Sequence, residues 1–520
     1  MGMSPWLLPA LIAIPFLGGI LAWVAERFSL TWPRWIGLLS MAATCVLAIW
    51  IWMHADTPGI IPAHGTPQFL IEFRMDWIPR WGVSFHLGLD GLGLLMILLT
   101  GVLGVLSVAC SWREIQQYVG FFHLNLLWNL AGVMGVFMAL DLFLFFVFWE
   151  AMLVPMYFLI ALWGHSSRGG RSRVYAATKF FLFTQAAGLL MLVAILALVW
   201  LHRQTTGNWT FNYLDLLYTE LSPTMEYVLM LAFFLGFAVK LPVFPLHPWL
   251  PDAHSQAPTA GSVDLAGVLL KTGAYGLLRF VLPMFPNASQ EFAPIAMGLA
   301  IFGILYGAKM ALVQTDIKRL VAYTSVSHMG FVLLGIYAGT TLALEGAVLL
   351  MLAHGLATGG LFILCGELYE RLHTRELHKM GGLARRAPHY ATALMFFALA
   401  SLGLPGLGNF IGEFLVLFGS FTVAPWMTSV AATGLILAAV YSLYIVQKAL
   451  HGPPAGDEEV EDLTGREQLM MASIMIGLIA LGLYPQPVID LARGSLAQIG
   501  HWYNHGAPML AVPAALGVTP

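Results

Sequence analysis

The sequence predicts an all-α polytopic membrane protein with about 14 transmembrane helices, and three observations support this fold class. First, 59% of the 520 residues are hydrophobic and only 10% are charged, whereas about 25% of residues are charged in an ordinary soluble domain. Second, apolar runs of about 20 residues, the length that crosses a bilayer, recur along the chain. Third, two of these runs are broken by proline or glycine beside an ionisable residue.

The first eight spans are predicted in two groups. The N-terminal segment, 1–117, holds three spans, at 3–23, 35–53 and 89–110. A first five-helix repeat over 118–281 holds spans four to eight, at 118–140, 142–163, 175–201, 225–247 and 260–281.

The remaining six spans follow the same plan. A second five-helix repeat over 291–450 holds spans nine to thirteen, at 291–313, 319–338, 342–368, 389–423 and 427–450. The segment 451–520 holds the last span, 467–487, and a tail whose part 488–503 is either an interfacial helix or a frayed end. None of the connections is long enough for a separate catalytic domain, so 1–520 is predicted to be a single membrane domain.

Breaks in the seventh and twelfth spans indicate that the two repeats are inverted. The seventh span is interrupted in Lys240-Leu-Pro-Val-Phe-Pro-Leu-His-Pro, and the twelfth in Gly403-Leu-Pro-Gly-Leu-Gly-Asn. Because the two breaks are five spans apart, these helices enter the membrane from opposite sides. An inverted-topology repeat of spans 4–8 and 9–13 requires this arrangement.

The distribution of lysine and arginine predicts the orientation, because cytoplasmic loops carry an excess of basic residues. Loops after odd-numbered spans carry fifteen of the 24 basic residues: Arg27, Arg34, Arg113, Arg168, Arg171, Arg173, Lys318, Arg319, Arg371, Arg375, Lys379, Arg385, Arg386, Lys448 and Arg466. The opposite side carries only Arg74, Arg80, Arg203 and Arg493. The first basic residue is Arg27, so the N-terminal run is predicted to be a retained span and not a cleaved signal peptide. We therefore expect a multi-pass protein of the bacterial inner membrane with both termini periplasmic.

Six ionisable residues are predicted to lie near the bilayer midplane. They are Glu150, Lys240, Lys271, His328, His354 and Glu413. Each falls within about seven residues of the middle of its span, and therefore within about 10 Å of the midplane. Such groups cost about 3 kcal/mol or more each in a membrane, so they are kept where they pair or line a hydrated path. Lys309 is a further candidate, while Lys179 and Arg279 lie near helix ends and could extend to the interface.

This row of residues suggests proton transfer. Burial weakens the proton affinity of a lysine and a nearby carboxylate strengthens it, so a movement of Glu150 relative to Lys240 would switch proton binding. Lys271, His328 and His354 would then relay the proton, because histidine titrates near neutrality and uses two nitrogens. Glu413 would be the terminal acceptor. In the structural alternative, a Lys–Glu pair only ties two helices together and each histidine is an interhelical hydrogen-bond partner.

Several other functions lack support in the sequence. The cysteines Cys45, Cys110 and Cys365 have no paired spacing, which argues against a disulfide framework and against a metal or cluster site. There is no HExxH, no phosphate-binding loop and no dinucleotide fingerprint. The net charge of −3 gives no reason to expect nucleic-acid binding. We therefore predict that the chain binds no cofactor and no metal.

Two long segments resemble signatures of a known family. The stretch KLPVFPLHPWLPDAHSQAPTAGSVDLAGVLLKTGAYGLLRF, from Lys240 to Phe280, and DIKRLVAYTSVSHMGF, from Asp316 to Phe331, resemble the antiporter-like subunits of respiratory complex I. The segments FFVFWEAMLVPM with Glu150 and GLGNFIGEF with Glu413 also fit this family. Its L and N members are expected to have lysine in the broken twelfth span, so Glu413 is similar to the M type.

The resemblance implies a role in a redox-driven proton pump, an NADH:quinone oxidoreductase. It implies that Glu150, Lys240, Lys271, His328, His354 and Glu413 carry protons. It also implies that FMN, iron–sulfur clusters and quinone reduction belong to partner subunits, that L- and N-type subunits are neighbours, and that this chain receives a lateral helix from the L subunit. Three alternatives remain open: a subunit of a multisubunit cation/proton antiporter, a subunit of a hydrogenase-linked or formate-linked complex, and a structural scaffold.

Overall fold

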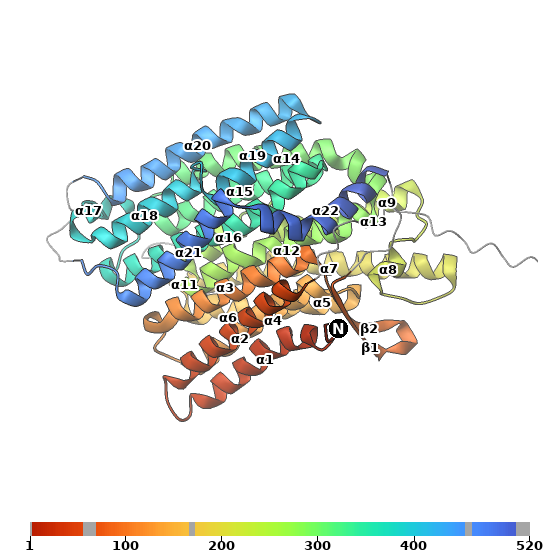
Figure 1. Ribbon diagram of the computed structural model, residues 1–520, viewed down its shortest axis with the longest axis horizontal. Coiled ribbons are helices and arrows are strands. Elements are labelled where there is room, and N and C mark those ends of the chain that lie inside the picture. The colour runs from red at the N-terminus through yellow and green to blue at the C-terminus, as the bar shows by residue number, and fades with distance from the viewer. Residues whose placement is uncertain (1–2, 56–68, 166–171, 453–459, 506–520) are drawn as a thin grey trace, which may run out of the picture.

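Long apolar helices lie side by side in the structure, a computed structural model that describes residues 3–55, 69–165, 172–452 and 460–505 (Figure 1). Within these residues, thirteen helices are long and apolar enough to cross a membrane. In chain order they are α1 (Leu7–Ala25), α2 (Trp32–His54), α3 (Gly91–Glu114), α4 (Val119–Met138), α5 with α6 (Leu142–Trp163), α7 (Arg173–Thr206), α9 (Pro223–Lys240), α11 to α13 (Thr259–Met284), α14 (Pro286–Leu312), α15 (Ile317–Ala338), α16 (Thr341–Leu372), α20 (Pro425–Ala449) and α21 (Gly465–Leu483).

The fourteenth span is the broken twelfth one, formed by α18 (Pro388–Ser401) and α19 (Gly408–Phe421). The predicted number of spans is therefore confirmed. Figure 1 shows the short helix α17 (Leu383–Arg386) at one end of the bundle and the strands β1 and β2 near the other. We call these the α17 end and the hairpin end. Of the loop arginines used to predict orientation, Arg168 and Arg171 lie outside the described residues.

Burial separates inner helices from outer ones. In the most apolar window of α15 and of the Thr259–Met284 helix every residue is buried, whereas only about a third are buried in α1 and α21. The outer helices expose large apolar side chains such as Leu39, Trp32, Ile436 and Leu469, as expected for helices that face lipid. The inner helices are thus enclosed by protein, and they carry three residues of the predicted row, Lys271, His328 and His354.

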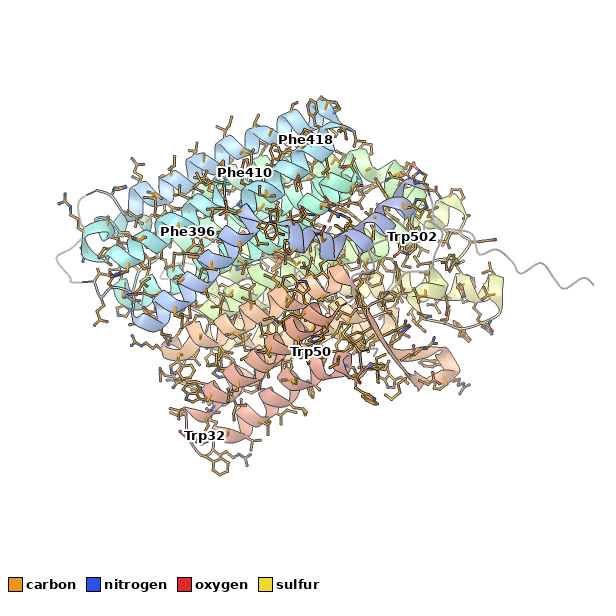
Figure 2. All side chains as sticks on the ribbon, in the orientation of Figure 1. Trp32, Trp50, Phe396, Phe410, Phe418 and Trp502 are labelled. Atoms are coloured by element: carbon orange, nitrogen blue, oxygen red, sulfur yellow. The ribbon has the colours of Figure 1, made fainter. Side chains whose placement is uncertain are left out.

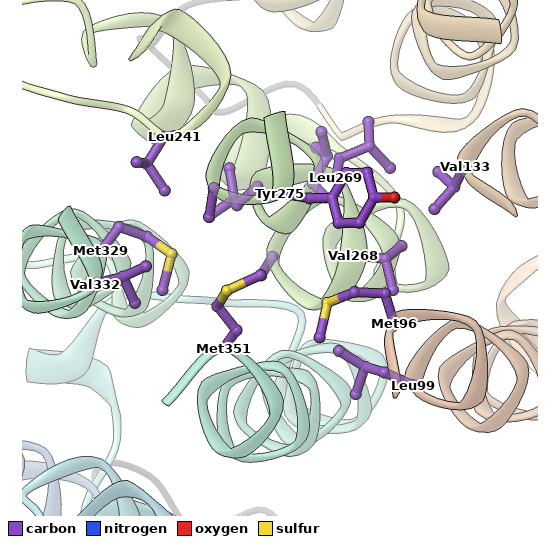
Figure 3. Packing of buried hydrophobic residues seen from close by; sticks show 14 of the residues in the cluster. Met96, Leu99, Val133, Leu241, Val268, Leu269, Tyr275, Met329, Val332 and Met351 are labelled. Atoms are coloured by element: carbon purple, nitrogen blue, oxygen red, sulfur yellow. The ribbon is translucent and has the colours of Figure 1, made fainter. Parts of the chain in front are cut away.

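Apolar side chains from several inner helices fill the centre of the bundle (Figure 3). Met96 and Leu99 of α3 approach Met351 of α16, and Val268 of the eighth span lies beside them. All four are at most 4% exposed. Dense packing of this kind holds the helices in fixed positions relative to one another.

Both predicted helix breaks are present. The seventh span stops at Lys240 and resumes as α10 (Trp249–Gln256), after a segment containing Pro242 and Pro245. The twelfth span is interrupted between α18 and α19, where Gly403 and Gly406 have positive φ angles of 81° and 95°. Glycine adopts this left-handed conformation without the steric cost that a side chain adds. Each break falls in the fourth helix of its predicted five-helix repeat.

Two further irregularities were not predicted. The fifth span is interrupted at Met152, between α5 (Leu142–Ala151) and α6 (Leu153–Trp163). Pro155 has no N–H to bond the carbonyl of Ala151, which explains the interruption. In the eighth span, α12 (Leu270–Gly276) lies between two π-helical turns, η2 (Leu265–Leu269) and η3 (Leu277–Val281), and α11 (Thr259–Asp264) and α13 (Leu282–Met284) complete it. Such turns occur frequently at functional sites.

The all-α prediction missed a β-hairpin in the connection after the second span. Strands β1 (Ile71–Ile78) and β2 (Val83–Leu89) pair antiparallel around the 3₁₀ turn η1 (Pro79–Trp81). Within β1 the first residues alternate buried and exposed, which is the period of a strand with one buried face. Asp141 fixes the hairpin to the bundle, because its carboxylate accepts a hydrogen bond of 2.9 Å from the backbone N–H of Ser84.

The tail segment 488–503 lies within a regular helix, α22 (Gln486–His505), which resolves the two alternatives in favour of a helix. Figure 2 shows α22 crossing the bundle at an angle to the spans, with Trp502 near its end. Leu496, Ile499 and Trp502 are buried against the bundle, and the Tyr503 hydroxyl donates to the carbonyl of Tyr337 at 3.1 Å. The remaining short elements are α8 (Tyr213–Leu216) and η4 (Leu377–Lys379).

A buried ion pair fastens the eighth span to the start of α3. The Asp90 carboxylate caps α3 by accepting from the Gly93 N–H at 2.9 Å, and it also pairs with the Arg279 guanidinium. Both side chains are at most 7% exposed. Arg279 thus has a buried carboxylate partner at the start of α3.

We expect Asp90→Ala to destabilise the fold by about 3–5 kcal/mol, because it leaves the Arg279 charge buried and unpaired. The measurement is the midpoint of heat-induced aggregation of the detergent-purified protein. The control is the double variant Asp90→Leu with Arg279→Met, which removes both charges and is expected to lie closer to wild type. An unchanged midpoint for Asp90→Ala would show that the pair contributes no stability.

Candidate functional site

The six predicted residues lie on six different helices near the middle of the bundle. Glu150 is on α5, Lys240 ends α9, Lys271 is on α12, His328 is on α15, His354 is on α16 and Glu413 is on α19. Five of them are at most 2% exposed, whereas Glu150 is half-buried. The structure brings four of the six into one connected chain and leaves Glu150 and Lys240 outside it.

The connected chain begins at Lys271. Its Nζ lies 2.8 Å from Nδ1 of His354 and also donates to the carbonyl of Ala266. The carbonyl belongs to the π-helical turn η2, so the irregular backbone supplies part of the lysine's hydrogen bonding. An ammonium group has only donors. When Lys271 is protonated, His354 Nδ1 therefore accepts from it, and the imidazole proton is then on Nε2.

The chain continues through two histidines to a carboxylate. The rings of His354 and His328 meet edge to face, with centroids 5.5 Å apart. Nδ1 of His328 lies 2.7 Å from Oε1 of Glu413. On its other side, Nε2 of His328 lies 3.3 Å from the Ser401 hydroxyl and 3.2 Å from the Tyr441 hydroxyl. His328 thus has hydrogen-bond partners on both nitrogens.

The break in the twelfth span gives the Glu413 carboxylate its space. Its second oxygen, Oε2, is buried without a hydrogen-bond partner. A Cβ atom on Gly403 would lie 2.9 Å from this oxygen, closer than real Cβ contacts allow. The positive φ angle at Gly403 favours glycine, and any side chain there would press on the carboxylate.

Lys240 and Glu150, the predicted switching pair, do not form an ion pair in the structure. Lys240 Nζ has no hydrogen-bond partner and lies 3.9 Å from the centre of the Trp149 ring. Oε1 of Glu150 is likewise buried without a partner. A cation over an indole face is stabilised by the ring quadrupole, so Trp149 holds the ammonium group in place of the carboxylate.

Close packing connects the two parts of the row. Gly273, two residues after Lys271, lies against the end of α9, and a Cβ there would be 2.7 Å from the carbonyl of Phe237 and 2.8 Å from the N–H of Leu241. These backbone atoms flank Lys240. The eighth span therefore packs directly against the break of the seventh, although no direct bond joins Lys240 to Lys271.

Sequence reasoning missed two ionisable residues of this region, His254 and Asp264. His254 of α10 is completely buried, stacks on Phe362 with ring centroids 4.6 Å apart, and has no partner on either nitrogen. It is near enough to Lys271 and Lys318 for electrostatic interaction. The sequence could have indicated His254, because this residue lies inside the quoted signature, after the break in the seventh span.

Asp264 is a fully buried carboxylate held by neutral groups. It accepts from Ser107 Oγ at 2.6 Å and from Asn129 Nδ2 at 3.3 Å. Asp264 could have been found in the sequence as a charged residue within an apolar run. It lies seven residues before Lys271 in the same span. The π-helical turn between them lets the two side chains face different neighbours, α3 and α4 for Asp264 and α16 for Lys271.

The secondary candidates lie outside the row. Lys309 is exposed on the outside of α14, so it does not extend the row. Lys179 pairs with Asp252 at 2.7 Å. Asp252 also pairs with Arg319 at 2.8 Å. This cluster ties α7, α10 and α15 together towards the α17 end.

Comparisons with known proteins place the chain in a family. Residues 139–438, more than half of the sequence, match the family profile described as NADH:quinone oxidoreductase/Mrp antiporter, TM. Over 506 residues the chain is 60% identical to the Pseudomonas aeruginosa protein named NADH-quinone oxidoreductase subunit M, covering 97% of this chain and 99% of that protein.

Solved structures agree. A chain of respiratory complex I from Thermus thermophilus with bound NADH matches with a TM-score of 0.84 and 33% identity, covering 96% of this chain and 98% of that one. A chain of the Mrp complex from a Dietzia species matches with a TM-score of 0.80 at 22% identity, covering 98% of this chain and 100% of that one, which indicates a shared fold. The chain thus belongs to the NADH:quinone oxidoreductase/Mrp antiporter membrane family, among the M subunits of NADH-quinone oxidoreductase.

Proposed function

We propose that this subunit moves protons across the membrane through the row Glu150, Lys240, Lys271, His354, His328 and Glu413. The observation that carries the proposal is the chain from Lys271 through two histidines to Glu413, with polar contacts of 2.8 Å and 2.7 Å at its two ends. Four titratable side chains in contact along one line, all buried, are an arrangement that side-chain packing alone does not require.

The two histidines supply the relay. Lys271 donates its proton to Nδ1 of His354, and His354 releases the proton it carries on Nε2 towards His328. Nε2 of His354 has no hydrogen-bond partner, so it is available for this release after a rotation of the ring. His328 then passes a proton from Nδ1 to Glu413. Imidazole suits this role because one nitrogen accepts while the other donates.

The first part of the row provides control. Lys240 exchanges protons with Lys271 through water or side-chain movement at the break of the seventh span, where backbone groups outside the helix can hold water. The distance of the Glu150 carboxylate from Lys240 sets the proton affinity of the lysine, because an opposite charge favours the protonated form. Energy that reaches this pair is thereby converted into proton release towards Lys271.

The subunit acts inside a larger assembly. We propose that L- and N-type antiporter-like subunits are its neighbours in the bacterial inner membrane, with both termini periplasmic and the α17 end cytoplasmic. The basic residues of the loops support this orientation. FMN, iron–sulfur clusters and quinone reduction belong to partner subunits in this proposal, and this chain binds no redox cofactor or metal itself.

Neutralising Glu150 tests the control step. We expect Glu150→Gln to preserve assembly while NADH-driven proton uptake and coupled quinone reduction fall by about 100-fold, a typical loss for a proton-transfer group. Proton uptake into inverted membrane vesicles measures this, and Glu220→Gln, a neutralisation in an exposed loop, serves as the control. Near-normal pumping in Glu150→Gln would favour the scaffold alternative.

Removing the central relay tests the chain itself. His354→Gln keeps a polar side chain but cannot bind and release a proton, so we expect proton uptake to fall by about 100-fold. The matched control is His501→Gln, which alters an exposed histidine of α22 and should leave uptake unchanged. If His354→Gln pumps like wild type, the proton takes a route that avoids the two histidines.

A further inference from the structure

The Glu150 carboxylate rests against α7 and not against Lys240. Gly188 of α7 lies so close that a Cβ atom built on it would overlap Oε1 of Glu150 and would lie 3.4 Å from Cδ. Any side chain at position 188 would therefore force the carboxylate to move. The hydrogen atom of a glycine leaves a notch in the helix surface, and the carboxylate occupies this notch.

Gln185 adds a polar side chain beside this notch on α7. It is three residues before Gly188, and residues at this spacing share one face of a helix. The Gln185 side chain interacts with the Glu150 carboxylate. Its amide is a neutral donor. The carboxylate therefore has a polar neighbour on α7 that adds no charge.

Trp149 holds the other member of the pair. The Lys240 ammonium lies 3.9 Å from the centre of its ring, and a Cβ on Gly188 would lie 3.5 Å from Cδ1 of the same ring. Consecutive residues thus keep the two charges apart, the cation on the indole and the carboxylate in the notch of α7. Glu150 is also the last residue but one of α5, two residues before the interruption at Met152, where a change of backbone conformation can move it.

We propose that Gly188 and Gln185 are positioning residues that hold the Glu150 carboxylate on α7, in one of the two positions it takes during proton transfer. In the other position the carboxylate approaches Lys240. This inference rests on the proposed function, because it takes the conformation with the carboxylate on α7 as the one in which Lys240 is ready to release its proton. Neither residue carries a proton itself.

The first test is Gly188→Ala in the assembled complex, with NADH-driven proton uptake into vesicles measured from pH 6 to pH 9, roughly the range around neutrality where such groups titrate. The added methyl group displaces the carboxylate from α7 towards Lys240, which then retains its proton more strongly. We expect uptake at neutral pH to fall by about tenfold and the pH optimum to move to higher pH. An unmoved pH optimum would overturn the proposal.

Controls separate positioning from packing. Gly236→Ala adds a methyl group on the facing helix α9, where a Cβ would lie 3.0 Å from Cβ of Met191, away from any carboxylate. It should leave the pH optimum in place even if stability decreases. Combining Gly188→Ala with Glu150→Asp removes one methylene and clears the methyl group, so uptake should recover relative to Gly188→Ala alone. An equal shift of the optimum in Gly236→Ala would refute a specific role of Gly188.

Gln185→Leu tests the role of the Gln185 amide, because it removes the polar group at nearly constant side-chain volume. It should move the pH optimum in the same direction as Gly188→Ala, because the carboxylate loses its neighbour on α7. If Glu150→Gln abolishes pumping while Gln185→Leu and Gly188→Ala behave like wild type, only the positioning role fails. If Glu150→Gln pumps normally, the proposed function fails as well.

Discussion

Lys271, His354, His328 and Glu413 are enclosed by protein at the centre of the bundle, where each ionisable side chain would cost about 3 kcal/mol or more without suitable surroundings. Most of the architecture follows from the need to provide these surroundings. The eighth span, α15 and α16 are almost wholly buried because they carry these groups. The outer helices, such as α1 and α21, carry apolar side chains outward and shield the inner ones.

Irregular backbone coincides with the ionisable residues along the whole row. Lys240 lies at the break of the seventh span, Glu413 follows the break of the twelfth, and Glu150 lies two residues before the interruption at Met152. Lys271 lies between two π-helical turns. A regular helix uses all its interior carbonyls and N–H groups, whereas a broken one leaves some free for side chains or water. The carbonyl of Ala266, bonded to Lys271, is a direct example.

Two classes of buried charge can be distinguished by their partners. Asp252 with Lys179 and Arg319, and Asp90 with Arg279, are ion pairs at the ends of spans. Their opposite charges are in contact, as expected for groups that fasten helices. The two lysines of the central row instead contact groups other than carboxylates: Lys240 contacts an indole, and Lys271 contacts an imidazole and a carbonyl. A charge without a fixed countercharge changes its protonation state more readily, which suits a transfer path.

The sequence by itself determined the membrane fold, the fourteen spans, the two proline and glycine breaks and the six residues of the row, because hydropathy and helix-breaking residues act locally along the chain. It did not determine the β-hairpin, which Asp141 from a distant part of the chain fixes to the bundle, or the interruption at Met152. Only the tertiary structure decided which members of the row touch. The order Lys271, His354, His328, Glu413 and the separation of Glu150 from Lys240 arise from packing between helices far apart in sequence. Glycines such as Gly273 and Gly188 set these distances, and a glycine in a sequence does not show which side chain will occupy the space it leaves.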